Sequence, residues 1–506
     1  MIHLPGLRIY LLIGGREARY DVETITIQED YTPGQEDDGM KEYGLMVVGS
    51  GAGMNVIDTA IALGHKVALV EEGPLGGTCL NRGCIPSKVL IHAADVIRET
   101  EMAERIGLKY KLEQVDYSAL KKRMWDIVLS GRHELEDAVK SAKEIDLYPV
   151  IGKFVGDYTM QVGTETIKAP KIVLATGARA SIPTTIPGLD KIKFHTYRTI
   201  YDVETQPESI IIIGGGYIGC EFAHFFSAIG TKVTLLGRNP ELLPGEEPET
   251  RALVKKRLSQ HADVHTGVER MSVDGKDGDL RVMVKDAQGE HSVQGQMLLV
   301  AAGVRSNTDW YKPEATGVRT DKNGWIMVNE YLETSKPNIY SLGDALGRNM
   351  FRHTANYESA IVRNNLFGKQ RSAIDLHAVP HAVFTDPQVG AVGMTEEEAK
   401  GNTKVLVGMA KYHDTAMGFA FGDLDAFVKV IVEYPTRRVL GGTVVGPQAS
   451  TLVQQIVLLM NAEDQTYGPL ARSQVIHPAL SEAIASAFGK LTPVNFEPPA
   501  HHHERR

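Results

Sequence analysis

The segment that most constrains this chain is residues 76–88, which contain two of its three cysteines. Cys79 and Cys84 lie five positions apart, and in a regular α-helix their Cα atoms would be separated by roughly 8–9 Å, beyond the ~7 Å limit for a disulfide. A bond between them requires a distorted first turn. Gly83 and Pro86 permit one, because glycine adopts unusual dihedral angles and proline is tolerated at the start of a helix. The segment predicts a strained, reducible dithiol; the alternative is two unpaired thiols.

Residues 76–88 read Gly-Gly-Thr-Cys-Leu-Asn-Arg-Gly-Cys-Ile-Pro-Ser-Lys, and this string resembles the flavoprotein disulfide reductases, most closely the dihydrolipoyl dehydrogenases. The resemblance implies that Cys79 exchanges with the substrate and that Cys84 faces the flavin as the charge-transfer thiolate. Lys88 follows Cys84 by four residues, on the same helix face, where a cation would favour the thiolate. A solvated surface lysine is the alternative. No metal site is expected, because a structural zinc site needs about four ligands and no second cysteine pair exists.

Composition narrows the class of protein. At 506 residues and 43% hydrophobic content the chain has room for three or four domains and a large core. A net charge of −9 argues against a general binder of nucleic acid or anionic membranes. No apolar run approaches the roughly 18 residues of a membrane span. With few cysteines and no export signal, we expect a cytoplasmic protein, where a disulfide is usually catalytic.

Residues 45–48 predict a buried parallel strand, followed by a glycine-rich turn, a helix over residues 55–63 and a second strand. In a dinucleotide fingerprint, glycines allow the tight turn and the close approach of the pyrophosphate to the helix N-terminus. The third glycine position is Met54, which should push helix and strand apart unless its neighbour relieves the crowding. Glu71 ends the second strand, where a carboxylate can bind a ribose hydroxyl. The glycines concerned are Gly49, Gly51 and Gly53.

Residues 209–237 repeat this architecture with a complete fingerprint. Two such units imply two dinucleotides, FAD and a nicotinamide. By the same resemblance, Tyr217 covers the nicotinamide pocket and Glu221 pairs with Lys88; a core tyrosine and a surface glutamate are the alternatives. The second strand ends in Gly-Arg238 rather than in the acid typical of NAD sites, and arginine there accommodates the 2′-phosphate of NADP, so this position favours NADPH. The fingerprint glycines are Gly214, Gly216 and Gly219.

Further segments resemble flavin markers of the same family. Residues 335–344 resemble the ribityl-binding segment, with Asp344 as the ribityl ligand; a strand ending in a turn is the alternative. Residues 353–358 and 221–224 look closer to the mycothione reductase branch. The other residues expected at the cofactors are Gly77, Thr78, Ala175, Thr176, Gly177, Gly303 and Gly343.

From residue 380 the chain becomes strand-rich, with an alternating run at 427–434, and resembles the dimerisation domain of the family. His477 and Glu482 lie near its end. Histidine titrates near neutrality and can move the proton, while a carboxylate one helical turn on holds the ring. In the family this pair reaches the dithiol of the other subunit, so each active site is shared in a homodimer. An ordinary His-Pro turn is the alternative.

The predicted fold class is α/β, with two Rossmann-like FAD/NAD(P)-binding domains and a C-terminal α+β dimerisation domain. Residues 1–39 are expected to lie outside the fold; an incorrectly assigned start or an accessory hairpin of residues 8–13 and 22–27 are alternatives. The predicted parts are the extension 1–39, an FAD-binding domain 40–190 with the dithiol, an NAD(P)-binding domain 191–308, a second FAD-binding segment 309–378, the dimerisation domain 379–492 and a flexible tail 493–506.

The resulting hypothesis is an FAD-dependent dithiol/disulfide oxidoreductase of dihydrolipoyl dehydrogenase type, moving electrons between NAD(P)(H), FAD, the Cys79–Cys84 disulfide and a small substrate such as lipoamide. An alternative is an NADPH-dependent reductase of mycothione, bis-γ-glutamylcystine or glutathione disulfide. A third is a non-catalytic flavoprotein that docks in a larger assembly such as a 2-oxoacid dehydrogenase complex. The presence of both cysteines, His477, Glu482 and Lys88 argues against this last possibility.

Overall fold

The computed structural model describes residues 40–497. The chain divides into two units, Met1–Met40 and Lys41–Arg506, and the fold below is that of the second. The predicted extension 1–39, with its alternative hairpin, lies outside the described residues, as does the end of the predicted tail, 498–506. None of the described helices is long and apolar enough to cross a membrane.

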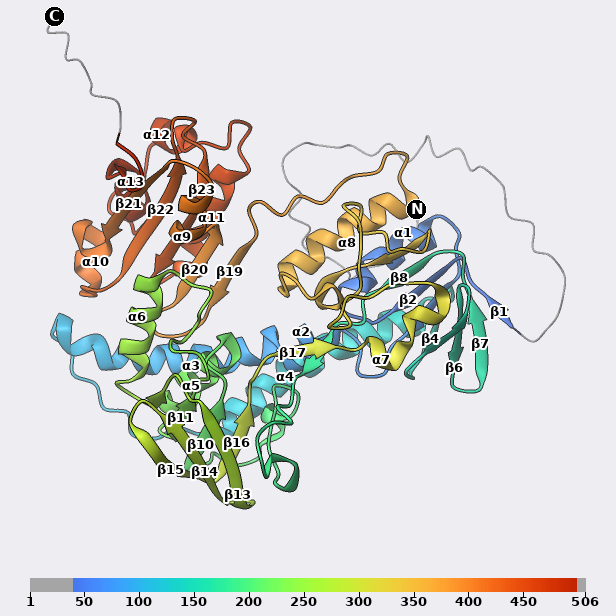
Figure 1. The fold of residues 1–506 in the computed structure, drawn as a ribbon, viewed down its shortest axis with the longest axis horizontal. Coiled ribbons are helices and arrows are strands. Elements are labelled where there is room, and N and C mark those ends of the chain that lie inside the picture. The colour runs from blue at the N-terminus through green and yellow to red at the C-terminus, as the bar shows by residue number, and fades with distance from the viewer. Residues whose placement is uncertain (1–39, 498–506) are drawn as a thin grey trace, which may run out of the picture. The chain divides into compact units, whose positions relative to one another are not determined.

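The first domain is built on a five-stranded parallel sheet with the order β18-β8-β2-β3-β4. All four residues of β2 are apolar and buried, as is usual for a parallel strand covered on both faces. The edge strand β18 comes from much later in the chain, with Ile339 opposite Ile172, so the chain returns to this sheet after building a second one (Figure 1). The strands are β2 (Leu45–Val48), β3 (Val67–Val70), β4 (Ile145–Tyr148), β8 (Ile172–Leu174) and β18 (Ile339–Ser341).

The helix after β2 differs from the prediction. A 3-10 turn, η2 (Ala52–Val56), precedes α1 (Ile57–Ala62), where the sequence predicted one helix over residues 55–63. Gly53 makes the close approach to the sheet: a Cβ built on it would lie 2.9 Å from both Ala175 Cβ and Val47 Cγ1. Met54 itself packs, partly buried, against the core of this domain. The neighbouring glycine therefore does relieve the crowding expected at the third fingerprint position.

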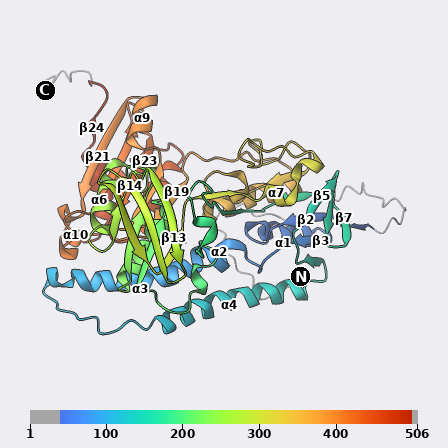
Figure 2. The ribbon, with the colours of Figure 1, turned by 60° about the horizontal axis from the view of Figure 1, so that its bottom comes forward.

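Two long helices, α3 (Cys84–Met102) and α4 (Tyr117–Ser141), lie side by side (Figure 2). The predicted helical region 89–146 is thus interrupted by η3 (Ala103–Ile106) and an irregular stretch. The helix α3 also packs on α5 of the second domain, where Asp95 Oδ1 lies 2.9 Å from His224 Nε2 and Arg98 Nη2 donates to Ser227 Oγ at 2.9 Å. The helix that begins at Cys84 therefore connects the first and second domains.

The second domain has a four-stranded parallel sheet with the order β12-β11-β10-β16. The four isoleucines of β10 are buried, and α5 begins directly after the glycine turn that follows them. An antiparallel sheet, β13-β14-β15, shares a hydrophobic core with this sheet. The elements are β10 (Ser209–Ile213), α5 (Tyr217–Ala228), β11 (Lys232–Leu236), β12 (Asp263–His265), β13 (Arg270–Lys276), β14 (Asp279–Asp286), β15 (Gly289–Gly295) and β16 (Met297–Val300).

The third domain is a six-stranded antiparallel sheet with the order β19-β20-β23-β22-β21-β24. The alternating run predicted at 427–434 forms strand β22, and the first six residues of this strand are all buried. Helix α13 packs on β22, and Phe427 joins a core shared with α3 and α5. The elements are β19 (Pro380–Val383), β20 (Val389–Gly393), α9 (Glu396–Asn402), β21 (Val405–Lys411), α10 (Ala416–Phe421), β22 (Phe427–Glu433), β23 (Val439–Val445), α11 (Ala449–Met460), α12 (Gly468–Arg472), α13 (Ser481–Gly489) and β24 (Thr492–Pro493).

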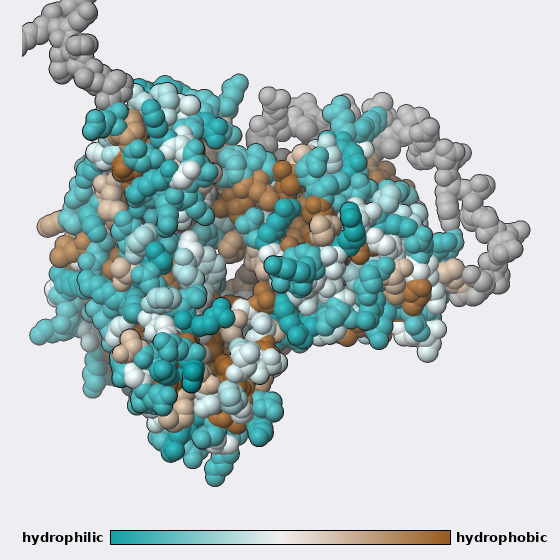
Figure 3. All heavy atoms as spheres, in the orientation of Figure 1, coloured by the Kyte–Doolittle hydropathy of each residue, from teal (hydrophilic) through white to brown (hydrophobic). Residues whose placement is uncertain are grey.

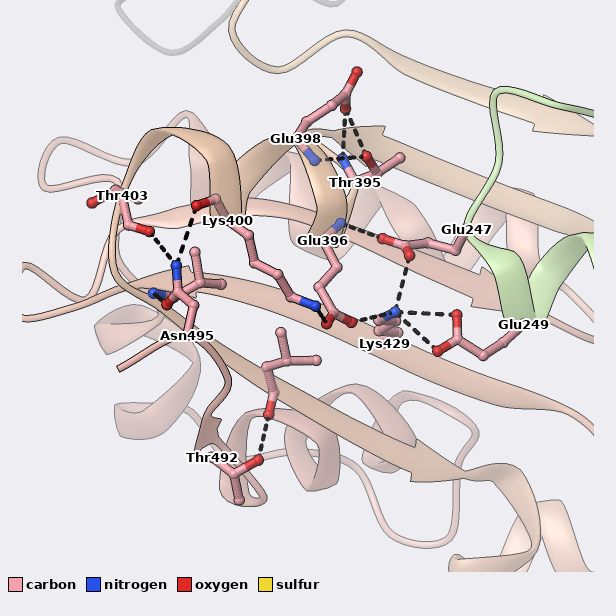
Figure 4. Close-up of polar contacts among 12 residues, drawn as sticks. Glu247, Glu249, Thr395, Glu396, Glu398, Lys400, Thr403, Lys429, Thr492 and Asn495 are labelled. Atoms are coloured by element: carbon pink, nitrogen blue, oxygen red, sulfur yellow. Dashed lines mark hydrogen bonds and ion pairs between the residues drawn. The ribbon is translucent and has the colours of Figure 1, made fainter. Parts of the chain in front are cut away.

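A buried ion network joins the third domain to the second (Figure 4). The Lys429 ammonium on β22, with 2% of its side chain exposed, lies 2.9 Å from Glu247 Oε2, 3.1 Å from Glu249 Oε1 and 2.7 Å from Glu396 Oε2. Glu247 also accepts a hydrogen bond from the Glu396 backbone N–H at 2.6 Å. A buried charge is tolerated only when it is paired in this way, so these four residues define how β22 and α9 meet the start of α6 (Pro248–Leu258).

The remaining elements complete the predicted α/β architecture of two parallel-sheet domains and a C-terminal α+β domain. Strands β9 and β17 pair antiparallel where the chain passes between the first and second domains. A small sheet, β1-β7-β6-β5, borders the first. These elements are β1 (Lys41–Glu42), β5 (Lys153–Gly156), β6 (Thr159–Val162), β7 (Glu165–Lys168), β9 (Ala178–Ala180), η4 (Leu189–Lys191), η5 (Ile200–Asp202), β17 (Val304–Ser306), α7 (Thr308–Tyr311), η6 (Pro313–Thr316), η7 (Gly343–Leu346), α8 (Arg352–Phe367) and η8 (Tyr412–Asp414), with α2 described below.

Candidate active site

A single cavity of about 1310 Å³ receives both glycine-rich turns and the cysteine pair. Its volume exceeds the roughly 300–1,000 Å³ of ordinary small-molecule sites, so there is room for more than one ligand. On the face of the molecule seen in Figure 3, hydrophobic side chains gather in the hollow beside α8 and otherwise lie scattered. The lining includes Gly49, Gly51, Glu71, Gly77, Thr78, Cys79, Cys84, Lys88, Ala175, Thr176, Gly177, Gly214, Gly216, Tyr217, Glu221, Arg238, Gly303, Gly343 and Asp344.

The two cysteines lie on separate helices. Cys79 belongs to α2 (Gly77–Arg82), Cys84 is the first residue of α3, and Gly83 forms the break between them. The sequence predicted a distorted first turn of one helix; the structure separates the helices completely. A Cβ on Gly83 would lie 2.9 Å from the Thr78 carbonyl oxygen, so glycine allows the close turn. Tyr201 Oη donates to the Gly83 carbonyl at 3.4 Å, which holds the break from the opposite side.

The two thiols are electrostatically unequal. The Cys79 thiol donates a hydrogen bond to Cys84, and this bond, with the charges of Lys88 and Arg352, lowers the pKa of Cys84 from 9.0 to about 7 against the opposing effect of burial. The same hydrogen bond and burial raise the pKa of Cys79. Both cysteines are unbonded thiols in this structure. Near neutral pH, Cys84 is therefore the thiol that ionises, and Cys79 keeps its proton.

The lysine that follows Cys84 is held by the second and third domains. Lys88 Nζ lies 2.7 Å from Glu221 Oε2 on α5 and 4.5 Å from the centre of the Phe384 ring. The other Glu221 oxygen accepts the Phe384 backbone N–H at 3.1 Å. Glu221 is the more buried partner, with 12% of its side chain exposed against 34% for Lys88. The carboxylate therefore fixes where the ammonium sits beside the thiolate.

The turn after β2 fits the adenosine and pyrophosphate part of a dinucleotide. A Cβ on Gly49 would lie 2.2 Å from the Ala175 carbonyl oxygen, and one on Gly77 would lie 2.8 Å from Gly51 Cα. Both glycines have positive φ, +102° and +64°, so the backbone stays open to a ligand. Glu71 follows β3 and accepts hydrogen bonds from Ser50 N and Oγ at 2.8 and 2.7 Å, which brings its carboxylate to the turn.

Orphaned polar atoms support the fit to a flavin nucleotide. The hydroxyl of Thr176 is buried without a hydrogen-bond partner on the cavity wall. Asp344 lies in η7, and burial raises its pKa. Behind it, Glu358 is 1% exposed and accepts the Gly343 backbone N–H at 2.6 Å through one oxygen, while its other oxygen has no partner. Burial raises the pKa of Glu358 to about 7.

The second glycine turn meets the same cavity and is even tighter. A Cβ on Gly219 would lie 1.8 Å from the Gly214 carbonyl oxygen, so only glycine allows α5 to start this close to β10. Tyr217 is the first residue of α5; its hydroxyl donates to Glu246 Oε1 at 3.0 Å, and its ring stacks on His381 at 5.8 Å between centroids. Tyr217 thus lines the cavity and is held by the second and third domains.

Two arginines line the cavity beyond the end of β11. Arg238 is exposed after the last residues of that strand, and Arg270 begins β13. Glu241 also lines this wall, but its carboxylate lies 2.6 Å from Arg251 Nη1. A carboxylate that is already neutralised accepts ribose hydroxyls less readily, whereas the two arginines provide guanidinium groups suited to a phosphate.

The histidine pair predicted near the C-terminus forms within one chain. His477 Nδ1 lies 2.9 Å from Glu482 Oε1, and Glu482 Oε2 accepts the Ala479 backbone N–H at 3.0 Å. These contacts lower the pKa of Glu482. A loop, rather than the predicted helical turn, carries His477 back to Glu482, because α13 begins only at Ser481. The His477 side chain is 70% exposed and is not among the residues lining the cavity of its own chain.

Four residues of the site were missed by sequence reasoning: Tyr201, Arg270, Arg352 and Phe384. Arg352 begins α8, its Nη1 lies 4.0 Å from the position of a Cβ on Gly51, and its charge acts on both cysteines. Arg352 immediately precedes the segment 353–358 that was singled out, so proximity to a marker was the available signal. No local pattern points to the other three: Tyr201 and Phe384 approach the cysteine segment from the second and third domains, and Arg270 lies on a strand of the second domain outside the glycine fingerprint.

Family models match two long parts of this chain. One, described as pyridine nucleotide-disulphide oxidoreductase, matches residues 43–359. A second, described as the dimerisation domain of the same oxidoreductases, matches residues 379–488.

Individual relatives match nearly end to end. The chain is 35% identical over 469 residues to a mycothione reductase of Mycobacterium tuberculosis, covering 89% of this chain and 99% of the relative. It is 33% identical over 457 residues to a dihydrolipoyl dehydrogenase of Thermus scotoductus, covering 89% and 98%. Among solved structures, the flavoprotein disulfide reductase RclA of Escherichia coli superposes with a TM-score of 0.77 at 27% identity, covering 88% and 99%.

Proposed function

The chain belongs to the pyridine nucleotide-disulphide oxidoreductase family, and we propose that within it this protein uses NADPH and bound FAD to reduce a small disulfide through Cys79 and Cys84. The flavoprotein class and a dimerisation domain are common to its relatives. The choice of NADPH and the direction of electron flow are our proposals. The single observation that carries the proposal is the pair of arginines, Arg238 and Arg270, on the nucleotide wall.

When bound, FAD supplies a two-electron acceptor for the hydride of the nicotinamide and a donor for the disulfide. Residues of both glycine turns line the cavity. The turn after β2 and Asp344 would hold the flavin nucleotide, and the turn before Tyr217 would hold the nicotinamide. Tyr217 would shield the nicotinamide position from water. Lys88, held by Glu221, keeps positive charge beside Cys84.

The reaction at sulfur begins when two electrons and two protons convert the Cys79–Cys84 disulfide to two thiols. Cys79, as a thiolate, attacks one sulfur of the substrate disulfide, and the released thiolate takes a proton from His477 of the partner subunit. Cys84 then attacks Cys79 Sγ, which re-forms the internal disulfide and releases the second thiolate. The sum is NADPH, a proton and one disulfide giving NADP⁺ and two thiols.

The unequal pKa values of the two cysteines support these roles, in which Cys79 attacks the substrate and Cys84 resolves the mixed disulfide. Cys84 ionises near neutral pH and is the one beside Lys88, as required of the resolving thiolate. Cys79 keeps its proton until a base removes it. His477, oriented by Glu482 and 70% exposed, has the geometry of a base presented to another chain. A homodimer therefore completes the site.

A second candidate is dihydrolipoyl dehydrogenase activity, in which electrons flow from dihydrolipoamide to NAD⁺. The segment at residues 76–88 favours it, and a relative of that name is 33% identical. It requires a carboxylate free to accept the ribose hydroxyls of NAD⁺ at the end of β11. On this wall Glu241 is already paired with Arg251, which is why we place this activity second.

The coenzyme is tested with Arg238→Ala and Arg270→Ala, measuring KM for NADPH and NADH separately. One charge-assisted bond to a phosphate is worth about 1.5–3 kcal/mol, so loss of either arginine should raise the KM for NADPH by roughly 10- to 150-fold. The KM for NADH should change by less than about threefold. Arg281→Ala, which removes an exposed arginine on β14 of the same domain that does not line the cavity, is the matched control. A parent protein with the lower KM for NADH overturns the coenzyme assignment.

The substrate is tested with steady-state rates on lipoamide, mycothione, bis-γ-glutamylcystine and glutathione disulfide, each with NADPH and NADH. The proposal expects the highest kcat/KM for a low-molecular-weight disulfide with NADPH. Alkylation of Cys79 and Cys84 after anaerobic addition of NADPH provides a readout independent of turnover. Failure of NADPH and NADH to expose these thiols would indicate a non-catalytic docking protein.

A further inference from the structure

Two histidines and an aspartate converge in the second domain, away from the cysteines. His265 is the last residue of β12, Asp286 the last of β14, and His291 lies early in β15, so the end of β12 meets the turn of the β14–β15 hairpin. One potential ligand atom from each residue lies within 4.8 Å of the other two. The imidazole rings are 4.9 Å apart between centroids.

The distances agree with a metal-centred arrangement. Asp286 Oδ2 lies 3.0 Å from His265 Nδ1 and 3.8 Å from His291 Nε2. Zinc takes nitrogen and oxygen ligands at about 2.0–2.1 Å in a tetrahedron, which separates neighbouring ligand atoms by about 3.3 Å. The two observed separations lie on either side of that value, which is compatible with ligand atoms that share one ion.

The burial of these side chains and a missing hydrogen bond also favour a bound metal ion. The side chains of His265 and Asp286 are only 7% and 4% exposed, and that of His291 is 29% exposed. His291 Nε2 is buried without a hydrogen-bond partner. A buried polar atom without a partner carries a desolvation cost that a ligand can remove. The Asp286 Oδ1 atom is already used, since it accepts the Gln288 backbone N–H at 2.8 Å.

A fourth residue stands where a supporting carboxylate is expected. Asp263 Oδ2 lies 3.0 Å from His265 Nε2, the nitrogen opposite the one that faces Asp286. Histidines that bind metals generally have a carboxylate at the other ring nitrogen, which fixes the tautomer and the ring orientation. The alternative for the same geometry is a protonated His265 between two carboxylates, but that arrangement leaves His291 Nε2 without a role.

We propose that His265, Asp286 and His291 bind one divalent transition-metal ion of the zinc class, with Asp263 as a positioning residue. Two imidazoles and one carboxylate suit Zn²⁺ and leave a position open to water on the exposed His291 side. The ion would clamp the β14–β15 turn to β12. The His265 carbonyl accepts the Gly237 backbone N–H at 2.8 Å, next to Arg238, so the clamp would stiffen the wall that carries the arginines.

The test measures Zn²⁺ binding to the FAD-loaded full chain. The thiols and the histidines at 501–503 also bind zinc, so every sample carries Cys79→Ser, Cys84→Ser and alanine at those three positions. We expect one Zn²⁺ per chain, a rise in the thermal unfolding midpoint, and an X-ray absorption spectrum with only nitrogen and oxygen neighbours at about 2.0–2.1 Å.

The variants distinguish the proposed ligands from their surroundings. His291→Ala, at the partly exposed position, should weaken binding by more than about 100-fold, and Asp263→Asn by about 10-fold, in line with the effect of supporting carboxylates. The matched control is His133→Ala, an exposed histidine on α4, which should bind as the background does. Absence of Zn²⁺ binding in the background protein, or unchanged affinity in His291→Ala, overturns the proposal. Neither result bears on the coenzyme or disulfide chemistry.

Discussion

Replacing Cys79 tests the claim that its hydrogen bond is the largest cause of the low pKa of Cys84. The pKa of Cys84 falls from 9.0 to about 7, and two units correspond to about 2.7 kcal/mol. Cys79→Ala removes the donor but leaves Lys88 and Arg352, whose effect is opposed by burial. We therefore expect the pKa of Cys84 to rise by about one to two units. Cys79→Ser keeps a hydroxyl donor and should hold the pKa within about half a unit of 7.

The assay is the rate of alkylation of Cys84 by iodoacetamide between pH 5 and 10, followed by mass spectrometry of its peptide. Cys220 is fully buried and does not compete. If the pKa rose from 7 to 9, the thiolate fraction at pH 6 would fall about 100-fold. A more basic thiolate is more nucleophilic, with a Brønsted coefficient of about 0.4–0.5, which restores roughly tenfold. The net rate at pH 6 should fall only about tenfold, while the midpoint of the profile moves clearly.

The sharpest comparison is between the alanine and serine variants. Equal midpoints near 7 in Cys79→Ala and Cys79→Ser would refute the hydrogen-bond explanation and leave the cations as the cause. In that case Lys88→Met, with Lys88→Arg as its charge-preserving control, should produce the larger shift. A midpoint near 9 in the serine variant as well would mean that neither account describes the site.

Three further predictions concern stability and the second domain. Lys429→Met leaves three glutamates without their shared ammonium partner, and it should lower the free energy of unfolding by about 3–5 kcal/mol in chemical denaturation. Lys193→Met, which removes an exposed ion pair, should lower it by less than about 1 kcal/mol in the same assay. The pKa of Glu358 is raised from 4.5 to about 7, so its contribution to stability is greatest below pH 4.5 and falls until about pH 7. Glu358→Gln should therefore raise the thermal midpoint more at pH 8 than at pH 5, the difference corresponding to at most about 3 kcal/mol, and equal gains at both values would contradict this. Gly219→Ala should abolish nicotinamide binding while flavin absorbance is retained, whereas Gly245→Ala, where a Cβ meets no atom within 4 Å, should bind normally in fluorescence titrations.

Features that depend on a few consecutive residues were predictable from the sequence. The buried strand at 45–48, the isoleucines of β10 and the glycine turns follow from backbone geometry, which neighbouring residues largely decide. The family assignment and the α/β class with its C-terminal domain are confirmed by the comparisons. The roles of individual site residues and the domain boundaries stay predictions.

Local patterns misled where packing overrode them. The alternating run at 427–434 predicted a strand but not its burial: the first six residues of β22 are all buried, with α13 packed on it and Phe427 in a core shared with α3 and α5. The helix expected over residues 55–63 begins instead as a 3-10 turn, because Gly53, and not position 54, approaches the sheet. His477 and Glu482 meet through a loop rather than along a helix.

The thirteen residues at 76–88 carried the resemblance that predicts a redox dithiol, whereas the spacing of the two sulfurs around a glycine alone left two unpaired thiols as an alternative. The resemblance predicted the contact between Lys88 and Glu221, whose charged groups lie 2.7 Å apart. Only the folded chain could reveal that Arg270 lines the same cavity as Arg238, or that His265, Asp286 and His291 form a cluster. Each of these unites side chains from different strands or domains. Linear spacing carries no information about which distant segments pack together; that choice is made by the burial of whole sheets and helices against one another.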